Sequence, residues 1–112
     1  MKLDSVGIVV AVRELDLDDD KKIYITIGTP QEFPEGGNFY CPYKIDGLGD
    51  GSVYYAGGVD AVQALELTLK RIGTDLYTST EFTNDRLRHL GMRNLGFPVP
   101  SSITDLVPPE NE

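Results

Sequence analysis

The chain has 112 residues, a formal net charge of −8 and 40% hydrophobic residues. This length fits one domain, and the composition is that of a folded globular protein, which excludes a largely disordered chain. The acidic balance disfavours nucleic acid and anionic membrane surfaces as partners, because phosphate groups repel negative charge.

The single cysteine, Cys41, excludes an intrachain disulfide, whereas small secreted domains often carry several. The apolar run from Val6 to Val12 is too short for a membrane span, which needs about 20 residues, and it lacks the cleavage site of a secretory signal. We therefore predict a cytoplasmic protein with no membrane and no nucleic-acid partner.

The first predicted elements form a β-hairpin. Residues 6–13 are rich in β-branched side chains and apolar on both alternating sides, which is typical of a central strand buried on both faces. An acidic turn follows at residues 16–20. In residues 22–28, Ile23, Ile25 and Ile27 alternate with other side chains, which predicts a half-buried strand.

Two more strands are predicted, at residues 38–45 and 52–56, after a loop at 28–37. Pro42 lies within the third strand and has no amide hydrogen to donate to a neighbouring strand. Its strand should therefore lie at an edge of the sheet or carry a bulge at this position.

An amphipathic helix is predicted at about residues 60–73. Asp60 is a good N-cap, Gln63 can return a hydrogen bond to the cap, and Gly73 is a plausible end. Five aliphatic residues, spaced three or four apart, form the stripe expected to face the sheet: Val62, Leu65, Leu69, Ile72 and Leu76.

A short second helix is predicted near residues 83–90, capped by Thr83, ended by Gly91, and with Leu87 and Leu90 facing inward. The predicted fold class is therefore α+β: a four-stranded, mainly antiparallel sheet with helix 60–73 packed on one face and the short helix near 83–90. Residues 1–98 should form one domain, and residues 99–112 an extended, flexible tail.

Three local patterns are similar to those of a bacterial family of small uncharacterised proteins. They are a Cys-Pro-aromatic strand at residues 41–43, a Gly-Leu-Gly turn at 47–49 and a Gly-Val-Asp-x-x-Gln-Ala-Leu helix start at 58–65. The closing Leu-Gly-Phe-Pro at 95–98 is also similar, so the resemblance covers residues 6–98. It implies a shared fold unit and a bacterial origin, and it implies no activity.

No constellation in the sequence predicts an enzyme. Cys41 and His89 are the only cysteine–histidine pair, and nothing in the sequence brings them together. The acidic turn lacks the ligand pattern of a calcium loop, and the glycine string at 47–51 leads into a strand rather than a helix. We therefore predict no catalytic residues, no cofactor and no metal.

The candidate partner-binding residues are acidic or aromatic, and for each group a purely structural interpretation stays open: a solvated hairpin turn, and cross-strand packing on a wet sheet face. An exposed sheet face with tyrosines is also typical of a protein interface. The candidates are Asp16, Asp18, Asp19, Asp20, Tyr24, Tyr54 and Tyr55.

These features favour a small acidic module that binds another protein. One specific form is an immunity-like or antitoxin-like protein that binds a basic partner through complementary charge. The alternative is a homo-oligomeric structural or accessory protein, whose partner is a second copy of itself. An enzyme is the third and least favoured class.

Overall fold

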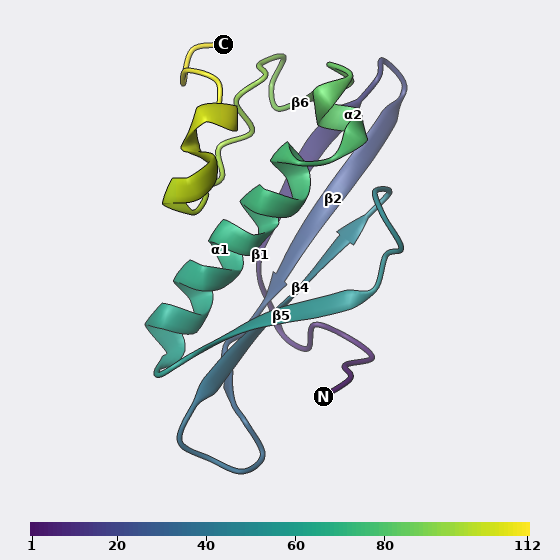
Figure 1. The fold of residues 1–112 in the computed structure, drawn as a ribbon. Helices are drawn as coiled ribbons and strands as arrows, with labels where there is room; N and C mark the ends of the chain where they lie inside the picture. The colour runs from purple at the N-terminus through teal and green to yellow at the C-terminus, as the bar shows by residue number, and fades with distance from the viewer. The chain divides into compact units, whose positions relative to one another are not determined.

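The computed structural model describes all residues, 1–112, and the fold is α+β. The strands form one antiparallel sheet in the order β3-β4-β2-β1-β6, with β5 paired to β4. The elements in Figure 1 are β1 Val9–Leu17, β2 Lys21–Gly28, β3 Gln31–Glu32, β4 Phe39–Asp46, β5 Val53–Gly58, α1 Ala61–Tyr77, α2 Thr80–Thr83, β6 Leu87–Arg88 and the 3-10 helix η1 Ser101–Leu106.

The chain divides into two compact units, Met1–Arg13 with Tyr24–Thr68, and Glu14–Ile23 with Leu69–Glu112. Three elements, β1, β2 and α1, contribute residues to both units. The single domain over residues 1–98 stays a prediction.

The sheet has six strands, so the predicted number of four is wrong. The two additional strands, β3 and β6, are two residues long and lie in the predicted loop at 28–37 and the predicted helix at 83–90. A strand of two residues is too short to show an alternating pattern in the sequence. Its position is set by the strand with which it pairs. Gln31 pairs with Tyr40 of β4, and Leu87 pairs with Leu17 of β1.

Pro42 stands in the middle of β4, which has β5 along one edge and β2 with β3 along the other (Figure 1). The edge alternative for this strand is therefore wrong. Pairing shifts by one residue between Ile27–Tyr43 in β2 and Gln31–Tyr40 in β3. Three residues, 28–30, stand opposite two residues of β4, 41–42, so the extra residue lies in the segment facing Pro42. The ladder is irregular beside Pro42, which has no amide hydrogen, but β4 itself carries no bulge and pairs with β5 in one register.

The isoleucine face of β2 is buried as predicted, since Ile23, Ile25 and Ile27 are all in the core. Tyr24 lies between them in sequence and is exposed. Within the first unit, Ile25 pairs directly with Ile45 of β4, so neighbouring strands contribute aliphatic side chains to the same face.

The start of α1 is confirmed. The amide of Gln63 donates to Oδ1 of Asp60 at 2.8 Å, which satisfies one of the amides that a helix N-terminus leaves without a partner. The return bond differs by one residue from a standard capping box, because Oε1 of Gln63 accepts from the amide of Val59 at 2.7 Å.

The end of α1 and part of its buried stripe differ from the prediction. The helix continues to Tyr77 and runs through Gly73. A Cβ atom at Gly73 would lie 2.1 Å from the carbonyl oxygen of Pro98, so this glycine permits close packing and does not end the helix.

In the first half of α1 the buried side chains are Ala64 and Thr68, whereas Val62 is 73% exposed. The backbone of β5 explains the difference. A Cβ at Gly58 would lie 2.4 Å from the amide nitrogen of Ala64, so strand and helix approach too closely for a large side chain between them.

The predicted second helix at 83–90 is wrong. The short helix α2 comes earlier, at Thr80–Thr83, and is capped by Ser79, whose Oγ accepts from the amide of Phe82. Asp85 then has a φ of 61°, which turns the chain out of the helix, and Leu87 enters the strand β6.

The C-terminal segment also differs from the expected extended chain, because residues 101–106 form the helix η1. Asn94 forms hydrogen bonds with the C-terminal residues of the second unit. Its amide donates to the carbonyl of Glu112 at 2.8 Å, and its side chain donates to the carbonyl of Pro108 at 2.7 Å.

Candidate functional site

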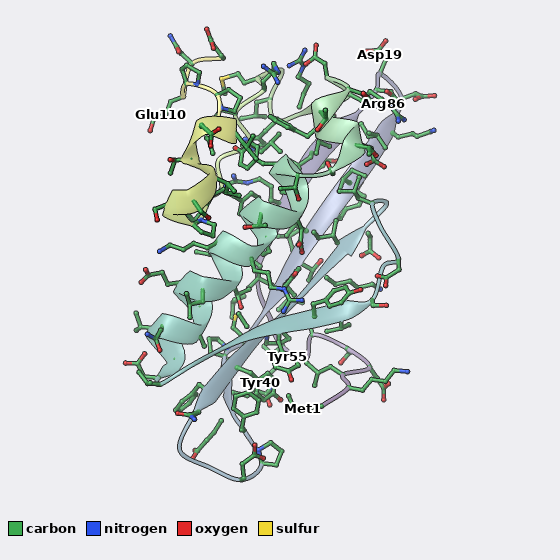
Figure 2. All side chains as sticks on the ribbon, viewed as in Figure 1. Met1, Asp19, Tyr40, Tyr55, Arg86 and Glu110 are labelled. Atoms are coloured by element: carbon green, nitrogen blue, oxygen red, sulfur yellow. The ribbon has the colours of Figure 1, made fainter.

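The acidic turn between β1 and β2 is partly neutralised by neighbouring cations. Arg86 donates two hydrogen bonds to Asp18, each 2.9 Å long, and this pairing holds the pKa of that carboxyl below its usual value. Lys22 forms an ion pair with Asp16. Asp19 and Asp20 form no ion pair and are exposed, and Figure 2 shows Asp19 at the outer end of the turn with Arg86 close by.

The three candidate tyrosines do not share one face of the sheet. Tyr54 pairs with the buried Tyr43, which alternates with Lys44 and so lies on the face of Ile45. Tyr24 pairs with Asp46, and Tyr55 pairs with Pro42, which places both on the opposite face. A tyrosine surface made of all three is therefore divided by the sheet itself.

Tyr55 belongs to an aromatic cluster with Phe33 and Tyr40. The ring centroids of Tyr40 and Tyr55 are 5.7 Å apart, and Figure 2 shows both side chains at the same end of the sheet. Phe33 lies 5.1 Å from Tyr40 and 5.9 Å from Tyr55. The two contacts of Tyr55 are edge-to-face, and the contact between Phe33 and Tyr40 is tilted, so the cluster packs the segment at residues 33–38 against the sheet.

Cys41 is completely buried in β4, and its thiol donates to the carbonyl of Gly28 at 3.4 Å. Burial raises the pKa of the thiol, and a hydrogen bond from Thr68 offsets this in part. Two surface cavities, of about 430 and 320 Å³, are lined by neither Cys41 nor His89. The thiol is therefore kept neutral and out of solvent, the opposite of a nucleophile's requirement.

We expect Cys41 to be inert in the folded protein. Its reaction with a chromogenic thiol reagent at pH 7.5 should be at least about 100-fold slower than in denaturant, because the sulfur is reached only when the core opens. Stopped-flow or manual absorbance measurements check this. Rapid stoichiometric reaction without denaturant would contradict the burial and revive a nucleophilic role.

A tight turn at Leu90 and Gly91 carries an unusual residue. His89 and Met92 exchange two backbone hydrogen bonds of 2.9 Å, and the φ angles of Leu90 and Gly91 are 52° and 82°. Such a turn favours Asn-Gly, because a leucine in the left-handed region costs about 1 kcal/mol. Leu90 is also 79% exposed, so it gains little from burial in return.

Replacing Leu90 by asparagine is expected to raise the free energy of unfolding by about 1 kcal/mol, since asparagine tolerates this φ. Thermal unfolding followed by circular dichroism should show a midpoint about 4 °C higher. Gly91→Ala is the control in which the expected change has the opposite sign. Nothing lies within 4 Å of its Cβ position, so the substitution adds only backbone strain, and the free energy of unfolding should fall. An L90N midpoint at or below that of the unchanged chain would contradict this account.

A run of exposed aliphatic side chains lies at Ile8, just before β1, and on the first half of that strand. Four aliphatic side chains are exposed there: Ile8 (77%), Val9 (49%), Val10 (53%) and Val12 (60%). Neighbouring residues of a strand point to opposite faces, so this half of the strand is exposed and apolar on both faces. The expectation that residues 6–13 form a strand buried on both faces is therefore wrong.

The reason is that β1 has only a partial neighbour on the side away from β2. β6 has only two residues, which pair with Asp16 and Leu17, and β6 is the last strand in the order of the sheet. We call the exposed run Val9–Val12 the β1 edge. The sequence predicted a central strand here because the run is apolar on both faces. The small number of long strands in the chain would have indicated that this strand is exposed.

The chain before the β1 edge is held firmly. The amide and hydroxyl of Thr29 both donate to the carbonyl of Ile8, at 2.8 and 3.0 Å. Val6 is buried, and its carbonyl oxygen occupies the place of a side chain at Gly28, where a Cβ would lie 2.0 Å away. The β1 edge therefore begins from a fixed point, which lowers the conformational cost of binding along it.

The charge around the β1 edge differs from that of the rest of the chain. Residues 1–13 contain Lys2, Arg13 and Asp4 and therefore have a net charge of +1. Residues 14–112 have a net charge of −9, which gives the −8 of the whole chain. A strongly basic partner would gain nothing from this segment and would be attracted to the acidic turn instead.

Two further properties of the whole chain concern ions and membranes. No group of three or more histidine, cysteine, aspartate or glutamate side chains is arranged to hold a metal ion. None of the helices has the length and the apolar character to cross a membrane.

Comparison with protein families gives one match. A family described as a domain of unknown function (DUF6968) matches residues 11–99, most of the chain. The match agrees with the resemblance to an uncharacterised family. No curated protein and no solved structure matches the chain.

Proposed function

We propose that this chain, which belongs to the DUF6968 family, is a protein-interaction module that binds a partner polypeptide along the β1 edge. The observation that carries the proposal is the exposure of Val9, Val10 and Val12, three apolar side chains close together in one strand. Proteins that stay apart usually protect such edges with lysine, proline or a bulge. None of the four residues of the β1 edge is charged, and Arg13 follows directly after it.

The exposed apolar side chains of this strand contribute stabilising free energy only when a partner covers them. Burying an aliphatic side chain fully is worth about 2 kcal/mol, so leaving Val9, Val10 and Val12 about half exposed forgoes about 3 kcal/mol. A partner strand would recover much of this and would also bond to the free backbone groups, the mode called β-strand addition.

The immunity-like or antitoxin-like form needs a different surface, because a basic partner is attracted by carboxylates. Asp19 and Asp20 are available for it, whereas Asp16 and Asp18 already pair with Lys22 and Arg86. The candidate tyrosines have less support as one interface, since the sheet separates Tyr54 from Tyr24 and Tyr55. The bacterial, cytoplasmic setting rests on the sequence alone. Catalysis has the least support, because the thiol of Cys41 is buried.

Affinity capture from the native cell, with three baits compared by quantitative mass spectrometry, tests the proposal. The unchanged chain and Val62→Lys, a control at an exposed valine of α1, should capture the same partner at near-stoichiometric amounts. The double variant V10K/V12K should capture at least about tenfold less, because two lysines disfavour strand pairing at an edge. Identical capture by all three baits would refute binding through the β1 edge.

A further inference from the structure

We propose that the larger surface cavity, of about 430 Å³, binds a small organic cation with an apolar body, such as an alkylammonium ion. Every residue that lines the cavity belongs to the second unit, within Leu69–Glu112. A volume of about 300–1,000 Å³ is typical of small-molecule sites. The β1 edge belongs to the first unit, so this inference goes beyond the proposed function and does not depend on it.

Much of the cavity lining is apolar. Tyr77, at the end of α1, and Phe82 of α2 supply aromatic rings whose centroids lie 4.9 Å apart in an edge-to-face contact. Both rings are buried, which fixes them as the floor of the cavity. Leu106 of η1 and Pro108 also line it, and Leu106 is 40% exposed. These side chains offer an apolar surface to the alkyl part of a ligand.

The one cationic side chain of the lining, Arg93, is already engaged. Its Nε lies 3.1 Å from Oδ1 of Asp85, and its guanidinium carbon lies 5.2 Å from the centre of the Phe82 ring, a cation–π contact. The same oxygen of Asp85 lies 2.9 Å from Nη2 of Arg88. Arg93 is therefore held by a ring and by a carboxylate that lies outside the lining.

Two carboxylates of the lining have no such partner. Asp105 and Glu112 are exposed and form no ion pair. Arg93 against these two carboxylates gives the lining a net charge of −1, which has the same sign as the −8 of the whole chain. The cavity therefore attracts a cation and repels an anion. An alkylammonium ion satisfies both the charge and the apolar lining, and it stays charged at neutral pH because amines of the lysine type have a pKa of about 10.4.

Three probes with the same hexyl chain test the charge preference by NMR titration of the isotope-labelled full chain. Hexylammonium should shift the amide resonances of Phe82, Leu106 and Val107 with a Kd of about 3 mM, as expected for a ligand of about seven heavy atoms. Hexanol should bind about fivefold more weakly, and heptanoate at least about tenfold more weakly. Heptanoate that binds as tightly as hexylammonium would overturn the assignment of a cation. Absence of shifts at these residues with hexylammonium would overturn the site.

The same titration distinguishes two sources of the cation. A lysine amide acetylated at its α-amino group carries the ammonium group on a peptide backbone. If this probe binds more tightly than hexylammonium, the ligand is a lysine side chain of a polypeptide, and if it binds more weakly, the ligand is a free amine. Failure of all these probes would leave the proposed function standing, because that proposal is tested through Val10 and Val12.

Two double variants test the carboxylates. Asp105→Asn with Glu112→Gln should weaken hexylammonium binding about fivefold. Asp19→Asn with Asp20→Asn is the matched control, because it changes the net charge of the chain by the same amount at exposed residues outside the lining. It should leave the Kd unchanged within about 1.5-fold. Unchanged binding in D105N/E112Q, or equal weakening in both double variants, would overturn the inference.

Discussion

Replacing Gly28 by alanine is expected to lower the free energy of unfolding by about 3 kcal/mol. A Cβ at this position would lie 2.0 Å from the carbonyl oxygen of Val6 and 2.8 Å from Cγ of Pro42. Both contacts are far inside van der Waals distance. The first is with backbone, which cannot rotate away as a flexible side chain can, so the segment before β1 has to move.

Urea denaturation followed by circular dichroism measures the loss, and an unchanged m-value would show that the denatured state is the same. Gly57→Ala is the matched control in β5, because the nearest heavy atom to its Cβ position, in the ring of Phe33, lies at an ordinary 3.5 Å. We expect G57A to leave stability unchanged within about 0.5 kcal/mol or to raise it slightly, since alanine restricts the unfolded chain. A loss below about 1 kcal/mol in G28A would mean that Val6 is not firmly placed.

Gly73→Ala is expected to destabilise the protein by about 2 kcal/mol, although the substitution improves the helix propensity of α1. Propensity alone predicts a gain of about 1 kcal/mol for alanine over glycine inside a helix. The structure predicts the opposite sign, because the new Cβ would lie 2.1 Å from the carbonyl oxygen of Pro98 and 3.0 Å from Cγ1 of Val99. The segment at residues 98–99, which packs against Gly73, would have to move away from α1.

Chemical denaturation of G73A beside Val62→Ala separates the two effects. Val62 is exposed on the same helix, so V62A reports propensity without a clash and should gain a few tenths of a kcal/mol. If both variants gain stability, the Pro98 segment adapts at little cost and the close approach does not restrain it.

The elements that the sequence predicted correctly have local signals. Alternation identified β2 and its buried isoleucine face, and the Asp60–Gln63 pair located the first turn of α1. Both features depend on residues within a few positions of each other, so no knowledge of the distant chain was needed. For Pro42 the missing amide hydrogen indicated an irregular ladder, although the extra residue lies in the segment facing β4.

The errors arose where a residue's role depends on a distant segment. Gly73 carries the same local signal whether a helix ends there or another chain segment crosses it, and only Pro98 distinguishes the two. The predicted stripe of α1 included Val62 because it is large and apolar. The close approach of Gly58 selected the smaller side chain of Ala64 instead.

The sequence by itself determined that this chain makes an acidic α+β protein with β-branched strands and one long amphipathic helix. Only the tertiary structure decided that the valines of β1 are exposed and not buried. Strand propensity indicates that a segment is extended, but the burial of its side chains depends on what packs against it. In this fold β6 pairs with Asp16 and Leu17 only, and the valines in the other half of β1 are exposed.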